Sequence, residues 1–311
     1  MTLSHDGSAL EQPEVVVGID IGGTGTRLVA WSTAGELVGR RTVATPTEAD
    51  AEHASSVLRS QIDAVLDGRR LTAVGIGASG PIDATGVIRN PDTLPAFTGI
   101  PLVADLASQL GVPVSIDNDA VCAAIAELKV GAGRGAEDLL HVTLGTGIGV
   151  AYLVNGKPVR GRDGAHPEAG HIAVSTPTPA CYCGRRGCWE QGASRLALQK
   201  SAASLLGLQA DDRTAIASLA ARADAGDATA RAAFDSYGVA LADGLATLLA
   251  VHRATTVVLG GSAAMHFHQY EATVNAELAT LGGWISTAQL LPTQLDDDGG
   301  AIGAAFLALG S

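Results

Sequence analysis

The sequence predicts an α/β fold built from two lobes, and three observations support this prediction. The chain has 311 residues, which is enough for two domains of ordinary size. Residues 15–31 (VVVGIDIGGTGTRLVAW) and 139–155 (LLHVTLGTGIGVAYLVN) share one plan: an apolar run, a turn of glycine and threonine, and a second apolar run. Each segment is followed by alternating strand and helix signals, so we expect two α/β lobes in succession.

The first lobe is expected to span residues 14–128 and to open with the hairpin of residues 15–31. Glycines at the centre of that segment suit a tight hairpin turn. The remaining elements of this lobe are expected in the following order: a helix rich in Glu and Ala near 48–66, a strand at 71–80, a strand at 113–118 and a helix at 120–131.

The second lobe is expected to span residues 129–297, with the boundary near Leu128–Glu137. The elements expected after its hairpin are, in order, several helices between Ala193 and Val251, a strand at 255–261, a helix and another short strand. The final segment, GGAIGAAFLALG, reads as a helix of small residues. We expect residues 298–311 to pack back against the first lobe, since small residues permit close approach.

Composition excludes several classes of protein. Residues 1–13 lack the basic start and apolar stretch of a signal peptide and are expected to form a disordered tail. No apolar run is long enough for a transmembrane helix, so we expect a cytoplasmic protein without a membrane partner. The chain has 32 acidic and 20 basic residues, a net charge of −12 and 4% aromatic residues. Such a surface repels phosphate backbones and offers few stacking platforms, so no nucleic-acid partner is expected.

Both hairpin turns are candidates for binding phosphate. Successive backbone N–H groups at a glycine turn can point toward an anion, because no Cβ blocks the approach. The residues concerned are Gly22, Gly23 and Thr24 in the first turn and Gly145, Thr146 and Gly147 in the second. Plain hairpin turns would use glycine as well, but two such turns in two related lobes favour a cleft with one phosphate-binding turn on each wall.

Two further features extend this expected cleft. Asp20 ends the first strand, where it would hold Mg²⁺ through water; its alternative role is to cap the turn. A strand that runs into Gly260 and Gly261 before a helix would let a flat ligand or a phosphate lie against the backbone. The spacing there fits neither a Walker A loop nor a dinucleotide fingerprint, and a plain strand–helix turn is the alternative.

One His and three Cys form a candidate metal site, namely His171, Cys181, Cys183 and Cys188. Clustered cysteines in a reducing compartment indicate a metal before disulfides. One imidazole and three thiolates make a closed tetrahedral set that suits structural zinc, and unliganded thiols are the alternative. Zinc would rigidify the loop beside Glu168, His171 and Glu190, whereas Cys122 lies in an Ala-rich helix and is expected to be a core residue.

Six motifs together resemble those of the ROK family of sugar kinases and related repressors: DIGGTGTR, SIDNDA, GTGIG, EAGH, CYCGRRGCWE and VVLGG. The resemblance runs from about Val15 to Leu309. It implies the two-lobed actin-like ATPase fold, a ribonuclease H-like fold shared with hexokinase and Hsp70, with a cleft between the lobes. It also implies a homodimer or homotetramer.

The resemblance implies a role for each matching position. The two glycine turns would bind the phosphates of Mg²⁺-bound ATP from both sides, while Gly260 and Gly261 would lie beside the adenosine. Asp119 would be the catalytic base that accepts the proton of the primary hydroxyl of the sugar; taken alone, it would be a helix N-cap. The positions implied to line the sugar site are Gly80, Asn118, Glu168, His171 and Glu190.

Two departures from the family pattern leave the sugar undefined. Sugar kinases often have Asn before a Leu-Pro-Gly-Trp-like stretch, whereas this chain has Thr93 there and Asn90 three residues earlier, so either could contact the sugar. His166 and Pro167 also replace a more common Gly-Glu-Ile-like pattern in the loop where substituents on carbon 2 would sit.

The implied activity is ATP-dependent phosphorylation of the 6-hydroxyl of a hexose, with glucose as the first expectation. The alternatives are an N-acetylglucosamine or N-acetylmannosamine kinase, a mannose or fructose kinase, and a catalytically silent sugar sensor. The net charge of −12 disfavours polyphosphate as the phosphoryl donor. A local basic patch for it could come from Arg160, Arg162, Arg185 and Arg186.

Overall fold

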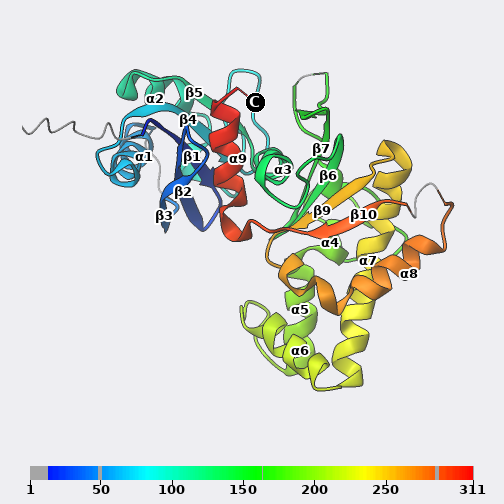
Figure 1. Ribbon diagram of the computed structural model, residues 1–311. Helices are drawn as coiled ribbons and strands as arrows, with labels where there is room; N and C mark the ends of the chain where they lie inside the picture. Colours follow the sequence, from blue (N-terminus) through cyan, green and yellow to red (C-terminus); the bar gives the residue numbers. More distant parts are fainter. Residues whose placement is uncertain (1–12, 48–50, 163, 284–286, 311) are drawn as a thin grey trace, which may run out of the picture.

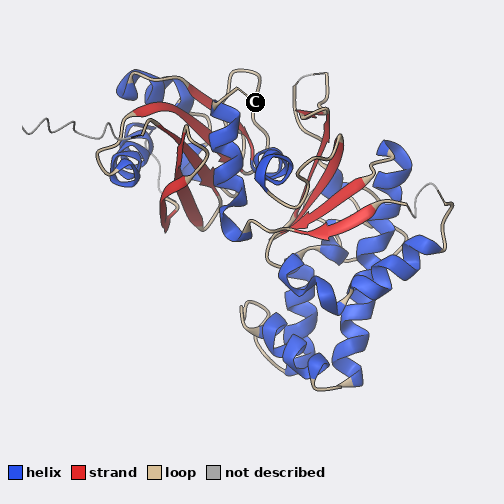
Figure 2. Ribbon diagram, viewed as in Figure 1, coloured by secondary structure: helices blue, strands red, loops and turns tan. Residues whose placement is uncertain are grey.

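The computed structural model describes residues 13–47, 51–162, 164–283 and 287–310. These residues form two five-stranded sheets, and each sheet with its helices makes one of two lobes that stand side by side (Figure 1, Figure 2). Residues 1–12 of the expected tail lie outside the described residues.

The first sheet has the strand order β3-β2-β1-β4-β5. Its strands are β1 (Val15–Ile21), β2 (Gly25–Ser32), β3 (Leu37–Ala44), β4 (Leu71–Ala78) and β5 (Val114–Asn118). β1 pairs antiparallel with β2, which confirms the first predicted hairpin, and parallel with β4. The register aligns Ile21, Ala78 and Asn118, so the carboxyl ends of three parallel strands meet at one edge. In open α/β sheets this edge is where ligands bind.

Helices cover both faces of the first sheet. α1 (Ala51–Leu66) and α2 (Leu102–Leu110) pack on one apolar face, and α9 (Gly299–Ala308) packs on the other. The contact with α9 is close, since a Cβ on Gly18 or on Gly75 would lie 1.9 Å or 1.7 Å from a backbone oxygen of that helix. Glycine at these two positions therefore lets the end of the chain pack on the first sheet.

The second sheet has the strand order β10-β9-β6-β7-β8. Its strands are β6 (Asp138–Leu144), β7 (Ile148–Val154), β8 (Lys157–Pro158), β9 (Thr256–Gly260) and β10 (Gln289–Pro292). β6 and β7 pair antiparallel as the second predicted hairpin, and β9 joins β6 in parallel. Residues alternate along β6, so that Leu140 and Val142 face the helices of the second lobe whereas Leu139 faces the first lobe.

The second lobe carries most of the helices. Its helices and helical turns are α4 (Glu190–Ala193), α5 (Arg195–Leu206), α6 (Ala215–Asp224), α7 (Ala228–His252), α8 (Glu271–Ala279), η2 (Ala169–His171) and η3 (Ala264–Gln269). Two further helical turns are η1 (Pro95–Phe97) in the first lobe and η4 (Asp296–Asp298), which directly precedes α9. Among the described residues, α7 is the one helix long and apolar enough to cross a membrane by length and composition. It contacts α4, α5, α6 and α8, and 56% of its most apolar window is buried. Its apolar side chains therefore form the core of this lobe.

α3 (Asp119–Val130) lies between the two sheets (Figure 1). It packs on α9 from the first lobe and on β6 and β7 from the second. A Cβ on Gly303 of α9 would lie 1.6 Å from the Cys122 carbonyl oxygen, so the two helices touch at their backbones. Cys122 is fully buried, which confirms it as a core residue. Asp119, the first residue of α3, is thereby held where the lobes meet.

Candidate active site

Two carboxylates come together at the ends of the strands of the first sheet. Asp20 lies near the end of β1, and Asp119 begins α3 directly after β5. Burial, followed by the negative charge of Asp119, raises the pKa of Asp20 to about 7, against the opposing effect of Arg27. A divalent cation between two such carboxylates would relieve their repulsion, and oxygen donors are the ligands that Mg²⁺ prefers.

Hydrogen bonds fix the position of Asp119. Its Oδ2 accepts a hydrogen bond from Ser79 Oγ at 2.7 Å. Asn118 is the N-cap of α3, and its Oδ1 accepts a hydrogen bond from the Ala120 N–H at 2.8 Å. Because the Asn118 oxygen is occupied by the helix, its NH₂ group is the part that can reach a ligand. Sequence reasoning did not single out Ser79, although it directly precedes the predicted Gly80.

The loop after β4 begins with Ser79 and is held by Asn90. Asn90 Nδ2 donates to the Ser79 carbonyl oxygen at 3.1 Å, and its Oδ1 accepts the Thr93 N–H at 3.3 Å. Gly80 has a φ of +86°, and a Cβ on it would lie 2.5 Å from Asn90 Nδ2. A Cβ on Gly23 would lie 2.7 Å from the Thr93 methyl group. Asn90 therefore lies beside Ser79 and Gly80, whereas Thr93 lies beside the first glycine turn.

The two glycine turns are alike in structure. The Gly22 N–H donates to the Gly25 oxygen at 3.1 Å, and the Gly145 N–H donates to the Gly147 oxygen at 3.0 Å. In both turns the threonine is exposed. The two loops are thus tight turns at strand ends, one from each lobe, and phosphate binding by them stays a prediction.

Glu190 lies against the second turn. Its Oε2 accepts the Ile148 N–H at 3.0 Å, and its side chain is buried. A Cβ on Gly147 would lie 2.2 Å from that oxygen, so any side chain at this turn position would displace the Glu190 carboxylate. The carboxylate thus connects the second turn to α4 and to the cysteine segment that precedes it.

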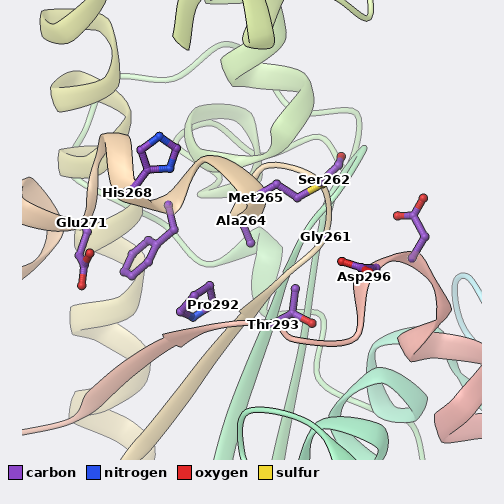
Figure 3. A pocket seen from close by; sticks show the side chains of 11 residues that line it. Gly261, Ser262, Ala264, Met265, His268, Glu271, Pro292, Thr293 and Asp296 are labelled. Atoms are coloured by element: carbon purple, nitrogen blue, oxygen red, sulfur yellow. The ribbon is translucent and has the colours of Figure 1, made fainter. Parts of the chain in front are cut away.

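A pocket of about 420 Å³ lies beside Gly261, at the end of the strand that was predicted to run into Gly260 and Gly261 (Figure 3). Its lining includes Gly261, Met265, His268, Pro292 and Asp296. Gly261 has a φ of +77°, and a Cβ on it would lie 2.6 Å from the Leu144 carbonyl oxygen. The close approach of the backbone to β6 therefore requires glycine there.

Gly260 differs from its neighbour, because it is buried in β9 and is not one of the residues that line this pocket. A Cβ on it would lie 2.7 Å from His141 Nε2. Burial lowers the pKa of His141 to about 4, so this imidazole is neutral at pH 7. Of the two predicted glycines, the structure therefore places Gly261 alone at the pocket.

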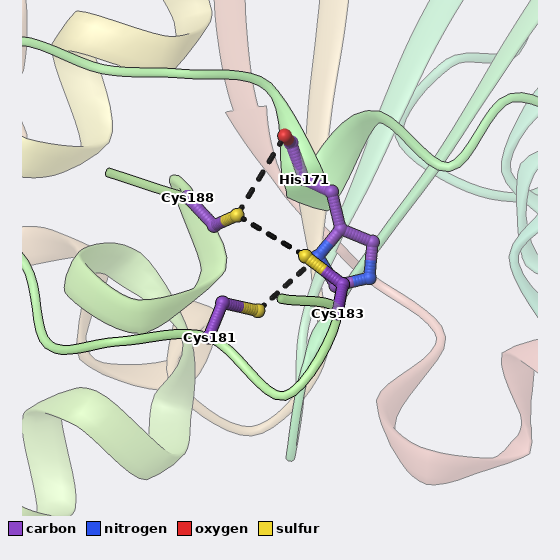
Figure 4. Close-up of side chains that lie close together, drawn as sticks. All are labelled: His171, Cys181, Cys183 and Cys188. Carbon is purple, nitrogen blue, oxygen red and sulfur yellow. Dashed lines mark hydrogen bonds between the residues drawn. The ribbon is translucent and has the colours of Figure 1, made fainter. Parts of the chain in front are cut away.

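Four side chains from one loop converge on a single point (Figure 4). The ligand atoms of His171, Cys181, Cys183 and Cys188 all lie within 4.8 Å of one another. The Cys181 Sγ is 3.5 Å from His171 Nδ1, and the Cys183 Sγ is 3.6 Å from the Cys188 Sγ. Sulfur ligands of a tetrahedral zinc with bonds of about 2.3 Å lie about 3.8 Å apart. The arrangement is therefore compatible with structural zinc.

Helix α7 anchors the loop that carries this cluster. Asp243 accepts the N–H groups of Ser175 and Thr176 at 2.8 and 2.9 Å. Trp189 is fully buried, and its indole N–H donates to the Ala240 oxygen at 3.0 Å. These contacts attach the loop to α7 on both sides of the cysteines, at Ser175 and Thr176 before them and at Trp189 after them.

The two remaining predicted sugar ligands, Glu168 and His171, lie at the start and the end of η2, where the His171 N–H donates to the Glu168 carbonyl oxygen at 3.1 Å. Glu168 is exposed and lies 3.4 Å from His166 Nε2. The hydroxyl of Tyr182 lies 3.2 Å from His171 Nε2. Desolvation, followed by the carboxylate of Glu190, raises the pKa of the Tyr182 phenol above its ordinary value. Sequence reasoning missed this tyrosine, and its place inside the cysteine motif was the available signal.

The four arginines considered for a basic patch have different surroundings. Arg160 forms an ion pair with Asp117 of β5. Arg185 Nη1 donates to the His171 carbonyl oxygen at 3.0 Å, while Arg162 and Arg186 are exposed. Two of the four are therefore engaged within the protein and do not form one free binding surface.

Comparisons with known proteins agree with this architecture. The chain matches the ROK family over residues 16–311. A glucokinase of Thermotoga maritima is 36% identical over 186 residues, which cover 60% of this chain and 59% of that protein, less than two thirds of its length. An N-acetylmannosamine kinase of Shigella flexneri is 31% identical over 302 residues, which cover 95% of this chain and 98% of that protein.

The fold is also that of solved structures. A ROK family glucokinase from Streptomyces griseus, in complex with glucose and AMPPNP, is similar with a TM-score of 0.79 and 31% identity, covering 96% of this chain and 100% of that chain. The two mixed sheets and their helices match this structure, which confirms the predicted two-lobed actin-like ATPase fold.

Proposed function

Because this chain belongs to the ROK family, we propose that it is an ATP-dependent hexose kinase that phosphorylates the 6-hydroxyl of glucose. The observation that carries the proposal is the position of Asp119, which begins α3 at the junction of the lobes, is hydrogen-bonded to Ser79 and lies close to Asp20. The similarity to proteins named glucokinase supports glucose as the sugar.

In the proposed reaction, Asp119 accepts the proton of the sugar 6-hydroxyl while that oxygen attacks the γ-phosphorus of ATP. A positioned base of this kind contributes about 10²- to 10⁴-fold to the rate. The rest of phosphoryl transfer is positioning and charge stabilisation. The N–H groups of the two glycine turns would bind the phosphates. Asp20 would hold Mg²⁺, which neutralises phosphate charge when bound.

The nucleoside of ATP would occupy the pocket beside Gly261. Its volume of about 420 Å³ lies within the range of about 300–1,000 Å³ that small-molecule sites show. Met265 and Pro292 supply apolar surface, while His268 and Asp296 supply polar groups at the edge. A base that stacks against the Gly261 backbone would place its phosphates toward the turn of β6 and β7.

The sugar would be held by polar side chains from both lobes. Sugar hydroxyls need fixed hydrogen-bond partners, and carboxylates are strong acceptors for them. The proposed ligands are Gly80, Asn90, Asn118, Glu168, His171 and Glu190, together with Asp119 itself. Asn90 is preferred to Thr93 because its amide lies beside Ser79, the residue that holds the base.

The Cys₃His cluster would bind one structural zinc ion. All four ligands come from protein, so the site has no open position for a substrate. Zinc on His171 Nδ1 would fix the orientation of the ring and turn Nε2 toward the sugar. The predicted metal site would therefore act on catalysis through the position of His171.

An assay that couples ADP formation to a detectable product tests the proposal directly. With Mg-ATP and a panel of glucose, mannose, fructose, N-acetylglucosamine and N-acetylmannosamine, we expect the highest kcat/KM with glucose. An N-acetylhexosamine is the second candidate substrate, because one relative, 31% identical to this chain, is named an N-acetylmannosamine kinase. A higher kcat/KM with such a sugar would replace glucose as the proposed substrate. Absence of turnover on every sugar would contradict the proposal, and sugar binding without turnover would indicate a sensor.

A further inference from the structure

Tyr182 occupies an unusual place within the cysteine cluster. It lies between Cys181 and Cys183, yet its side chain is exposed, at 79% of the full accessible surface. Its hydroxyl is 3.2 Å from His171 Nε2. The two rings meet edge to face, with 5.2 Å between their centroids and an angle of 82°. The ring therefore stands at the surface and directs its hydroxyl at the histidine.

Tyr182 contacts the ring nitrogen of His171 that is not directed at Cys181, namely Nε2. Nδ1 lies on the Cys181 side, where a metal would bind. A metal on Nδ1 leaves the ring proton on Nε2, so Nε2–H donates to the Tyr182 oxygen. The Tyr182 proton can then be donated to a carboxylate, and Glu190 is close to this phenol.

A sugar hydroxyl would make the same pair of hydrogen bonds, accepting from His171 Nε2–H and donating to a carboxylate. We propose that the Tyr182 hydroxyl occupies the place of a sugar hydroxyl in the unliganded protein and must leave before the hexose binds. This inference rests on the proposed function, since it takes His171 to be a sugar ligand. It makes Tyr182 a residue that sets sugar affinity.

The side chain is suited to such a movement. Its ring is exposed and its contact with His171 is a single hydrogen bond with an edge-on ring contact. A conformation that excludes the ligand lowers the apparent affinity in proportion to its population. One hydrogen bond of ordinary net strength corresponds to a reduction of about twofold to tenfold.

Calorimetric titration of the zinc-loaded protein with glucose, without nucleotide, tests the competition. Tyr182→Phe keeps the ring and removes the competing hydroxyl. We expect its Kd for the sugar to fall about twofold to tenfold relative to wild type. Tyr152→Phe is the matched control, because it removes a tyrosine hydroxyl of β7 that donates to the His252 carbonyl oxygen at 3.2 Å. The Kd of this control for glucose should equal that of wild type. An unchanged or weaker affinity of Tyr182→Phe would overturn the proposal.

A second measurement does not depend on any sugar. In ¹⁵N NMR of the zinc-loaded protein, the His171 Nε2–H signal should shift and exchange faster with water in Tyr182→Phe, and should stay in place in Tyr152→Phe. An unshifted signal in Tyr182→Phe would refute the contact itself. If the signal shifts but wild type neither binds nor phosphorylates any hexose of the panel, the proposed function fails separately, together with the sugar-competing role.

Discussion

The carboxylate of Asp117 in the first lobe forms an ion pair with Arg160 in the second lobe. Asp117 directly precedes Asn118 and lies two residues before Asp119. Asp117 is buried, with 7% of its surface exposed. Its Oδ1 accepts the Asn118 N–H at 2.7 Å, while Oδ2 faces Arg160. One carboxylate therefore joins the backbone that carries the proposed base to the loop that leads to Glu168 and His171.

Arg160→Met should destabilise the protein and slow catalysis. The substitution leaves Asp117 as a buried charge without its partner, which lowers the free energy of unfolding by roughly 1–3 kcal/mol when the arginine is partly exposed. Urea unfolding and kcat measure the two effects. Arg186→Met, at an exposed arginine of the same chain, should change stability by no more than about 0.5 kcal/mol. Equal effects of the two substitutions would show that the ion pair does not stabilise the interface of the lobes.

Asp20→Asn should make the metal-free protein more stable in a pH-dependent manner. The pKa of Asp20 rises from 3.8 to about 7 on folding, so the folded state binds a proton that the unfolded state has lost between these values. Stability therefore falls as pH rises from about 4 to about 7, by about 4 kcal/mol at most.

The measurement is urea unfolding of wild type and Asp20→Asn at several pH values without Mg²⁺. The advantage of the variant should grow through that window and stay constant above it. Asp92→Asn, at an exposed carboxylate, serves as the control and should follow wild type. A difference that does not vary with pH would contradict the burial argument. We also expect Asp20→Asn to lose kinase activity, since a neutral amide binds Mg²⁺ weakly.

Cys188→Ser should abolish stoichiometric zinc binding and lower the melting temperature. A four-ligand site that loses one thiolate holds the metal poorly, and structural zinc contributes directly to folding. Elemental analysis should find one zinc per chain in wild type and in Cys122→Ser, which alters the cysteine outside the cluster. Wild type without zinc, or Cys188→Ser with a full equivalent of zinc, would show that the cluster is not a zinc site.

The regular elements with a strong local pattern were predictable. Both hairpins, the helix of α3 and the small-residue helix α9 follow from apolar periodicity and glycine placement, and the structure contains them. β3 and α2 were missed. Strand β3 (Leu37–Ala44) contains two arginines and is half exposed, so its alternation is weak. For helix α2 the sequence did contain a signal, namely the glycine at its end. Gly111 terminates the helix with a φ of 68°, in the left-handed region that favours glycine.

The candidate site was predictable in composition and less so in contacts. The cysteine spacing sufficed to propose a metal cluster, because its members are close in sequence. The pairing of Asp117 with Arg160 joins residues 43 positions apart on different lobes, and no local pattern specifies it. Asp119 alone would read as an N-cap, but Asn118 takes that role. The orientation of Tyr182 toward His171 depends on how the loop folds around the cluster.

Whether Asp119 is the base for phosphoryl transfer is decided by comparing Asp119→Asn with wild type in the coupled assay and in glucose titration. We expect a kcat lower by at least about 10²-fold, with glucose still bound, because the amide preserves the shape and the hydrogen bonding of the carboxylate. A variant that retains the kcat of wild type would show that Asp119 is not the base.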